Sequence, residues 1–478
     1  MEATLSDRLN LDVTIDEFSV SLLPRPRISG RGMTFRIPGR PDLPPFIAID
    51  RFWMDIGLLT VLRRHVETVH LDNMKIAVPP DKSHDLPAPD RGSGDGGGSD
   101  IVVDHLIAHH AELSFVPDEP DDTPLLFEIH ELAMNGVGFA RAIEFHAKLT
   151  NPVPRGEIET QGTFGPWRRD HPTATELQGL YTFTGADLST IDGIGGRLAS
   201  RGSYGGRITE IHANGTTDTP DFNLDLGGKP VPLTTTYEAV IDGTNGTTRL
   251  TKVDAKLGST TIHTSGVITN LPGPNGKDIR LDYAITGGRI EDVLRLVVNS
   301  PKPMLVGDIT VRGTMALPPG RGPVRRRLRL AGRFGLADAR FTDAGAQQKL
   351  QELSRRSQGI KKDDADEMER VMTDLAGEFT LGAGVLNFKQ ITFEVPGAAV
   401  ALAGTYTIEG EAIDLTGTMR MKTSASKAIG GVKSIFIKPF DFLFRKDGAG
   451  AVVPIKIAGT RDAPKMGIQM GKVFGRGK

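Results

Sequence analysis

The chain has 478 residues, and its 57 lysine and arginine residues nearly balance 59 aspartate and glutamate residues. This balance excludes the global positive field of a nucleic-acid-binding protein, and the absence of cysteine excludes disulfide frameworks, cysteine nucleophiles and thiolate metal sites. The length predicts about two to four domains. With 57 glycines, 31 prolines and 38% hydrophobic residues, the composition favours many turns between short strands over deep spherical cores.

Residues 1–80 carry strand signals almost from the start. Apolar and polar residues alternate over 11–15, again over 33–37, and over 66–71, which predicts strands with one apolar face. The apolar stretch 46–62 lies between them, and its later part is expected to form a short helix or a turn.

Residues 81–100 are rich in Asp, Pro, Ser and Gly and predict a flexible linker or loop. The strand pattern then continues through 101–345 as a β-meander, nearly unbroken to about residue 288. Turn dipeptides of the kind that closes tight hairpins divide this region. They are Asn135-Gly136, Asn214-Gly215, Asn245-Gly246 and Asn275-Gly276.

Helical patterns are few. Residues 289–298 predict one short helix, and 346–376 predict a helical insertion with helices over 347–357 and 364–375. In the second of these, Met368, Val371, Met372 and Leu375 share one stripe, and Gly377 follows as a natural stop. Strands are expected to resume over 377–478.

No catalytic signature is present. There is no nucleophile elbow and no phosphate-binding or dinucleotide fingerprint, so the sequence predicts a protein that is not an enzyme and has no cofactor. His105, His109 and His110 are compatible with a metal pair but are interpreted as polar positions on a strand, because no acidic partner has the required spacing. The basic run 325–329 predicts a solvated edge or turn, or alternatively a site for anionic headgroups.

The segment 434–444 combines phenylalanines with flanking basic residues. Such a segment suits contact with anionic lipid headgroups, and the alternative is that its rings plug the end of the β-structure as core. The candidate membrane-contact residues are Lys433, Phe436, Lys438, Phe440, Phe442, Phe444, Arg445 and Lys446.

A family resemblance rests on several of these segments. The closing residues 433–450 and 453–465, together with 332–334, 339–342, 353–354 and 358–359, resemble the C-terminal region of AsmA-family proteins. The opening of the chain, at 24–26, 49–62 and 70–72, is similar to the N-terminal pattern of that family. The middle agrees only in its strand character.

The resemblance implies a bacterial envelope protein. Members of the family are usually anchored in the inner membrane by an N-terminal helix and project into the periplasm. Larger relatives form long curved sheets with an apolar trough, implicated in moving phospholipid toward the outer membrane. The anchor helix is absent from this chain, so we expect a fragment, an alternative start or a peripheral protein.

The pattern and the resemblance together predict a mainly β fold. We expect about 25 strands in an elongated, curved antiparallel sheet that forms an apolar trough or flattened barrel, with a few short helices. An apolar face without covering helices must close on itself or accept a ligand, so both an open groove and a dry core remain possible. Strand parity gives the candidate lining Phe379, Leu381, Leu386, Phe388, Phe393, Val395, Val400, Leu402, Ile413, Leu415, Met419, Met421, Ile455 and Ile457.

The expected function is non-catalytic. The chain is predicted to hold or conduct phospholipid, or another acyl lipid, along this groove at a membrane surface, and so to contribute to outer-membrane lipid homeostasis. One alternative is a structural or chaperone-like factor in outer-membrane protein assembly, with envelope assembly proteins as partners, in which the sheet edges recruit a partner strand. Another is a carbohydrate-binding β-solenoid, although two tryptophans and five tyrosines provide few aromatic platforms.

Overall fold

The structure is a computed structural model of the whole chain. It describes residues 11–21, 27–55, 65–78, 102–115, 125–138, 141–166, 174–225, 228–271, 277–298, 300, 302–342, 373–395, 398–421, 452–460 and 463–468. Two compact units divide the chain. Unit 1 comprises residues 1–222, 234–253 and 267–278, and unit 2 comprises 223–233, 254–266 and 279–478.

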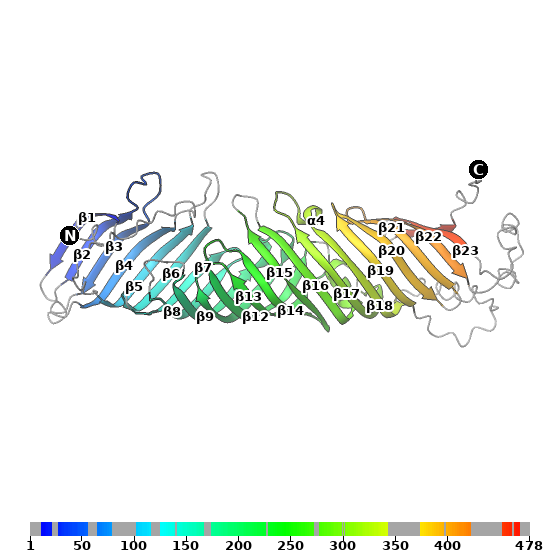
Figure 1. Ribbon diagram of the computed structural model, residues 1–478, viewed down its shortest axis with the longest axis horizontal. Coiled ribbons are helices and arrows are strands. Elements are labelled where there is room, and N and C mark those ends of the chain that lie inside the picture. The colour runs from blue at the N-terminus through cyan, green and yellow to red at the C-terminus, as the bar shows by residue number, and fades with distance from the viewer. Residues whose placement is uncertain are drawn as a thin grey trace, which may run out of the picture. The chain divides into compact units, whose positions relative to one another are not determined.

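In unit 1, strands that follow one another in the chain lie side by side, with one exception (Figure 1). They are β1 (Asp12–Ser21), β2 (Arg27–Arg36), β3 (Ile47–Asp55), β4 (His65–Val78), β5 (Val102–Phe115), β6 (Leu125–Val137), β7 (Ile143–Pro152), β8 (Arg155–Phe164), β9 (Glu176–Asp187), β10 (Ile194–Gly195), β11 (Arg197–Arg207) and β12 (Glu210–Leu224). The exception is the two-residue β10, because β9 pairs directly with β11 and β10 pairs with β12. A 3-10 turn, η2 (Leu188–Thr190), precedes β10.

Five strands contribute residues to both units, namely β12, whose Asn223 and Leu224 belong to unit 2, and β13 (Val231–Ile241), β14 (Thr248–Leu257), β15 (Thr260–Asn270) and β16 (Lys277–Arg289). Unit 2 continues with α3 (Ile290–Val297), β17 (Leu305–Leu317), α4 (Val324–Arg327), β18 (Arg329–Phe341), β19 (Thr373–Gly382), β20 (Val385–Val395), β21 (Ala398–Thr407), β22 (Ala412–Met421), β23 (Val452–Thr460) and β24 (Ala463–Ile468).

The expectation of a mainly β, antiparallel fold with few helices is confirmed. Burial alternates along most strands, as in β9, where every second residue from Leu177 to Phe183 is half-buried and the residues between them are exposed. Each sheet ladder therefore has an apolar face and a polar face, and these two terms are used below. One pairing departs from the expected meander, because β4 and β5 run parallel.

The turn dipeptides have two different roles. Asn245-Gly246 forms the expected turn between β13 and β14, with Gly246 at φ 76°. Asn214-Gly215 was expected to close a hairpin, and this prediction is wrong: the dipeptide lies inside β12, where Asn214 pairs with Ser203 and Gly215 with Gly202. Gly215 is needed for a different reason, because tyrosine hydroxyl groups occupy the space above its α-carbon.

A line of unpaired residues crosses six strands of unit 1. The cross-strand pairing skips these positions, and the apolar residues on either side are three apart instead of two, as in Ile49 and Phe52 or Leu71 and Met74. The register is the same on both sides of these positions from β1 to β6, and it shifts, as at a β-bulge, only between β6 and β7. The line consists of Asp16, Gly32, Asp50, Asn73, His110 and His130.

The core of unit 1 lies along this line of unpaired residues. The buried cluster consists of the residues that flank the line, namely Ile49, Phe52, Leu71, Met74, Ala108 and Ala111. These flanking residues pack together on the apolar face and bury one another. On the polar face Gly32 (φ 64°) leaves room for the carboxylate of Asp16, and Arg51 donates to Asp72.

Unit 2 contains a line of β-bulges, and the buried residues of its core lie on either side of that line. Register shifts occur at Ile285/Gly288, at Val306/Asp308 and at Leu336/Ala339. The buried cluster of this region again flanks the bulges and consists of Ile285, Ile290, Ile309, Val311, Leu336 and Ala339.

The helix predicted over 289–298 is confirmed as α3. Its residues Val293 and Leu294 pack on the apolar face of β16 to β18. A buried carboxylate holds it there, because Asp292 Oδ2 accepts hydrogen bonds from Ser259 N (2.9 Å), Ser259 Oγ (2.8 Å) and Thr260 Oγ1 (3.0 Å). α3 is therefore anchored to the turn between β14 and β15.

We expect Asp292→Asn to lower the free energy of unfolding of unit 2 by about 2–3 kcal/mol, because loss of the negative charge weakens all three hydrogen bonds and the amide NH2 adds a buried donor without a partner. Urea denaturation followed by circular dichroism measures this. Asp282→Asn is the matched control, since Asp282 is exposed on β16. Equal stabilities of the two variants would contradict the anchoring role.

The predicted helical insertion 346–376 is largely outside the described residues, as is the linker 81–100. Only its last residues can be compared with the structure. Residues 373–375, expected to end the second helix, form the start of β19 instead, because Leu375 pairs with Leu336 of β18 and with Phe393 of β20.

Candidate functional site

The residues selected by strand parity share the apolar face of β19 to β23 in unit 2. One cross-strand row contains Phe379, Phe388, Gly404, Leu415 and Ile457. Adjacent rows contain Leu381, Leu386 and Ile413, then Phe393, Val400 and Met419, and then Leu402 and Ile455. The side chains of Val395 and Met421 are outside the described part of the chain.

Burial is uneven across these rows. Leu381, Val400, Leu402 and Ile455 are buried and act as core. The other described candidates are half-buried, so their side chains keep part of their surface open to whatever lies on this face. The patch therefore has buried side chains at its centre and apolar side chains with accessible surface around them.

Unit 1 has an apolar face of the same kind, which the sequence analysis did not select as a site. Half-buried side chains surround its core cluster on six strands, β1 to β6. They include Ile15, Ile28, Met33, Phe35, Ile47, Met54, Val69, Ile76, Leu106, Ile129 and Leu132. These side chains keep part of their apolar surface accessible on this face.

Aromatic rings on the apolar face lie over glycines of the neighbouring strand. A β-carbon on Gly179 would be 2.8 Å from Tyr204 Cζ, so the ring occupies the space of the missing side chain. The ring therefore lies along the sheet and leaves a low apolar surface. Directly paired examples are Phe52/Gly30, Tyr204/Gly179, Tyr181/Gly202, Tyr283/Gly313, Phe379/Gly332 and Phe334/Gly377.

The hydroxyls of three tyrosines of unit 1 are satisfied internally. Ser200 Oγ donates to the carbonyl of Thr216 (3.0 Å), so it accepts from Tyr181 (3.0 Å), and Tyr181 in turn accepts from Tyr237. In a second series of hydrogen bonds, Thr160 Oγ1 donates to the carbonyl of Leu180 (2.8 Å) and accepts from Tyr204 (2.8 Å). The protons of these three tyrosines are committed, so their rings present mainly carbon to the apolar side.

Burial raises the pKa of Tyr204 and Tyr237 above the ordinary value of 10.0, and the bond to Tyr181 raises that of Tyr237 further. A raised pKa in the folded state means that stability is complete below pH 10 and is lost as the pH rises above it. We therefore expect the free energy of unfolding to fall above about pH 10. Tyr237→Phe should reduce that fall in urea titrations at pH 9 and 11, and an unchanged pH profile would contradict this.

The polar candidates have other partners. His105, His109 and His110 lie on strand β5, where His105 Nδ1 is 2.9 Å from Asn135 Oδ1 and His110 Nδ1 is 3.5 Å from Asp72. No group of three metal-ligating side chains occurs in the described ranges. In the basic run, Arg325 and Arg326 both contact Glu409 (3.1 Å), which holds the pKa of that carboxyl below its ordinary value.

Neither protein-family models nor curated proteins give a match to this chain. The candidate membrane-contact residues between 433 and 446 are outside the described residues. Within the part that the structure describes, no helix is long and apolar enough to cross a bilayer.

Proposed function

We propose that the protein holds acyl lipid on the apolar faces of its two units and allows the chains to move along them. The observation that carries this proposal is the accessible apolar surface, in which half-buried aliphatic and aromatic side chains follow one another across consecutive strands. Burying one methylene group on such a surface is worth about 0.8 kcal/mol, so an acyl chain would be held firmly.

The flat aromatic rings support lateral movement. Because each ring lies over a glycine, it does not form a ridge between strands that an acyl chain would have to cross. Each displacement then exchanges one apolar contact for an equivalent one and costs little free energy. In unit 1 the hydroxyls of Tyr181, Tyr204 and Tyr237 support the same function, since their hydrogen bonds leave none of these three donors unpaired toward the acyl chain.

The resemblance to the AsmA family is the reason for proposing phospholipid, an envelope location and a role in outer-membrane lipid homeostasis. In this proposal the protein is not an enzyme, and the membrane surface supplies and receives the lipid. A scaffold that assembles envelope proteins through its sheet edges is the alternative.

Lipid extraction of the purified chain tests the proposal. The protein is purified in mild detergent, extracted with organic solvent and examined by mass spectrometry. Stoichiometric phospholipid supports lipid binding. A folded protein without lipid would contradict it and would favour a scaffold with dry cores.

A further inference from the structure

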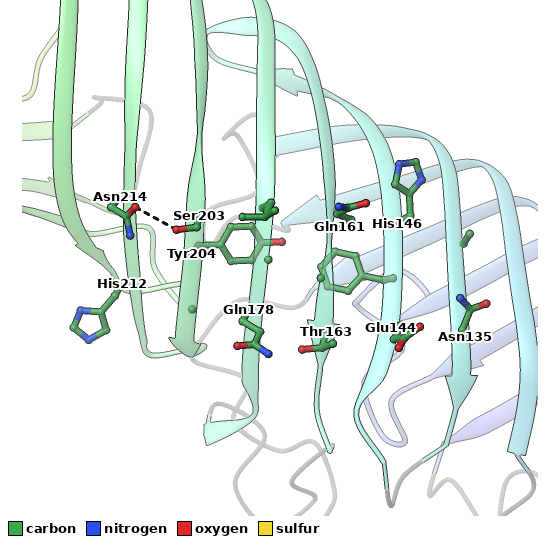
Figure 2. Close-up of a pocket in the computed structure, with 16 residues that line it drawn as sticks. Asn135, Glu144, His146, Gln161, Thr163, Gln178, Ser203, Tyr204, His212 and Asn214 are labelled. Atoms are coloured by element: carbon green, nitrogen blue, oxygen red, sulfur yellow. Dashed lines mark hydrogen bonds between the residues drawn. The ribbon is translucent and has the colours of Figure 1, made fainter.

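An open groove lies on the polar face of unit 1. It has a volume of about 840 Å³ and crosses the six strands β6, β7, β8, β9, β11 and β12. Figure 2 shows its labelled side chains in two rows, with His146 and Gln161 in one row and Glu144, Thr163 and Gln178 in the other. The strand registers give the same arrangement, since Gln161 pairs with Leu180 and Thr163 with Gln178.

The lining of this groove is mainly polar, in contrast to the apolar face on the other side of the sheet. Amide and hydroxyl groups dominate, and of the described residues that line it, none is lysine or arginine. The side chains of Gln161, Thr163, Gln178 and Glu144 have no hydrogen-bond or ion-pair partner among the described residues. Nucleic acids and phosphorylated ligands need basic partners, so this lining disfavours both.

An exposed leucine lies at the centre of these polar groups. Leu180 is 57% exposed, and it is directly opposite Gln161 and two residues from Gln178 on the same strand. Apolar surface flanked by paired amide donors and acceptors matches a sugar ring, which has an apolar C–H face and a rim of hydroxyl groups. All six strands are already paired, so an extended peptide cannot bind here by adding a strand.

We propose that this groove binds a neutral glycan chain, with sugar rings over Leu180 and hydroxyl groups bonded to Gln161 and Gln178. Six strands at a spacing of about 4.8 Å give a groove about 24 Å long, which accommodates several linked sugars rather than one. The glycan site is on the opposite sheet face from the proposed lipid surface, and it does not depend on that function.

Isothermal titration calorimetry of the full chain tests this with cellohexaose, maltohexaose and chitohexaose. At least one hexasaccharide is expected to bind, and its disaccharide at least tenfold more weakly, because it contacts fewer strands. The double variant Gln161→Ala/Gln178→Ala should bind that hexasaccharide roughly tenfold more weakly. Both side chains are exposed, so folding should be unaffected.

Gln390→Ala is the matched control, since Gln390 is an exposed strand glutamine of unit 2, and it should bind as the parent chain does. The lipid content of all variants should be unchanged, which separates this proposal from the lipid proposal. Absence of binding by all three hexasaccharides would overturn it. Binding that the double variant leaves unchanged would also overturn it.

Discussion

Replacing Gly202 by alanine is expected to lower the free energy of unfolding of unit 1 by about 2–3 kcal/mol, the cost of overpacking a filled site. A β-carbon at this position would clash with the main-chain oxygen of Asn214, and it would be 2.9 Å from Tyr181 Cε1. The ring of Tyr181 cannot move aside without breaking its hydroxyl bonds to Ser200 and Tyr237. Urea denaturation, followed by tyrosine fluorescence and circular dichroism, measures the change.

Gly335→Ala provides the control. Gly335 is also a strand glycine, but no heavy atom lies within 4 Å of the β-carbon that the substitution would add. This variant should be stabilised by about 0.4–1 kcal/mol, because alanine restricts the unfolded chain without straining the folded one. If alanine at Gly202 and at Gly335 has the same effect on stability, the proposal that Gly202 is needed to leave room for the ring of Tyr181 is wrong.

The variant Tyr181→Ala distinguishes the steric contribution of the tyrosine ring at Gly202 from that of the neighbouring backbone. Where the ring is the main obstacle, the double variant Gly202→Ala/Tyr181→Ala should lose less stability than the sum of the single variants, by about 1 kcal/mol or more. Strict additivity would mean that the backbone of β12 alone prevents a larger residue at Gly202.

A charge on the apolar face should remove bound lipid. Leu415→Asp places a carboxylate in the row that contains Phe388 and Ile457, and an acyl chain lying on that row would have to desolvate the charge. We expect at least a tenfold loss of co-purifying lipid, about 1.4 kcal/mol. Quantitative lipid mass spectrometry of equal amounts of protein measures this.

Thr416→Asp is the control for this variant. Thr416 is the next residue of β22, and it is exposed on the polar face, whereas Leu415 is half-buried. The control should retain its lipid and its circular dichroism spectrum. Leu415→Gln, which adds polarity without charge, covers the case in which the aspartate variant does not fold. Retention of lipid by both Leu415 variants would contradict the proposed surface.

The strands were predictable because their signal is local. Alternation of apolar and polar residues has a period of two, and it correctly gave the facing of every described candidate from Phe379 to Ile457. Short α3 was predictable for a similar reason, since its apolar stripe lies within eight residues.

The lines of unpaired and bulged residues, and the glycines that lie under aromatic rings, depend on information that one strand does not contain. The three-residue spacing of Ile49 and Phe52 is visible in the sequence, but one such step is indistinguishable from an imperfect strand until Leu71 and Met74 lie beside it. Gly215 follows an asparagine, which is typical of a hairpin turn. Only the register that puts it opposite Gly202 reveals its other role.

The apolar face of unit 1 and the polar groove were missed for different reasons. The resemblance directed the search for a lipid site toward the C-terminal strands, although Met33 and Phe35 show the same parity signal. The groove brings together single residues from six strands, such as Gln161 and Gln178, and no motif in the sequence connects them.

Photo-crosslinking at two adjacent positions tests the central claim most directly. Benzoylphenylalanine is placed at Leu415 on the apolar face or at Thr416 on the polar face, and the chain is irradiated in the presence of phospholipid vesicles. Our account predicts a phospholipid adduct, detected by mass spectrometry, at position 415 and none at 416. Equal labelling of both positions, or labelling of 416 alone, would contradict the proposal that acyl chains lie on the apolar face.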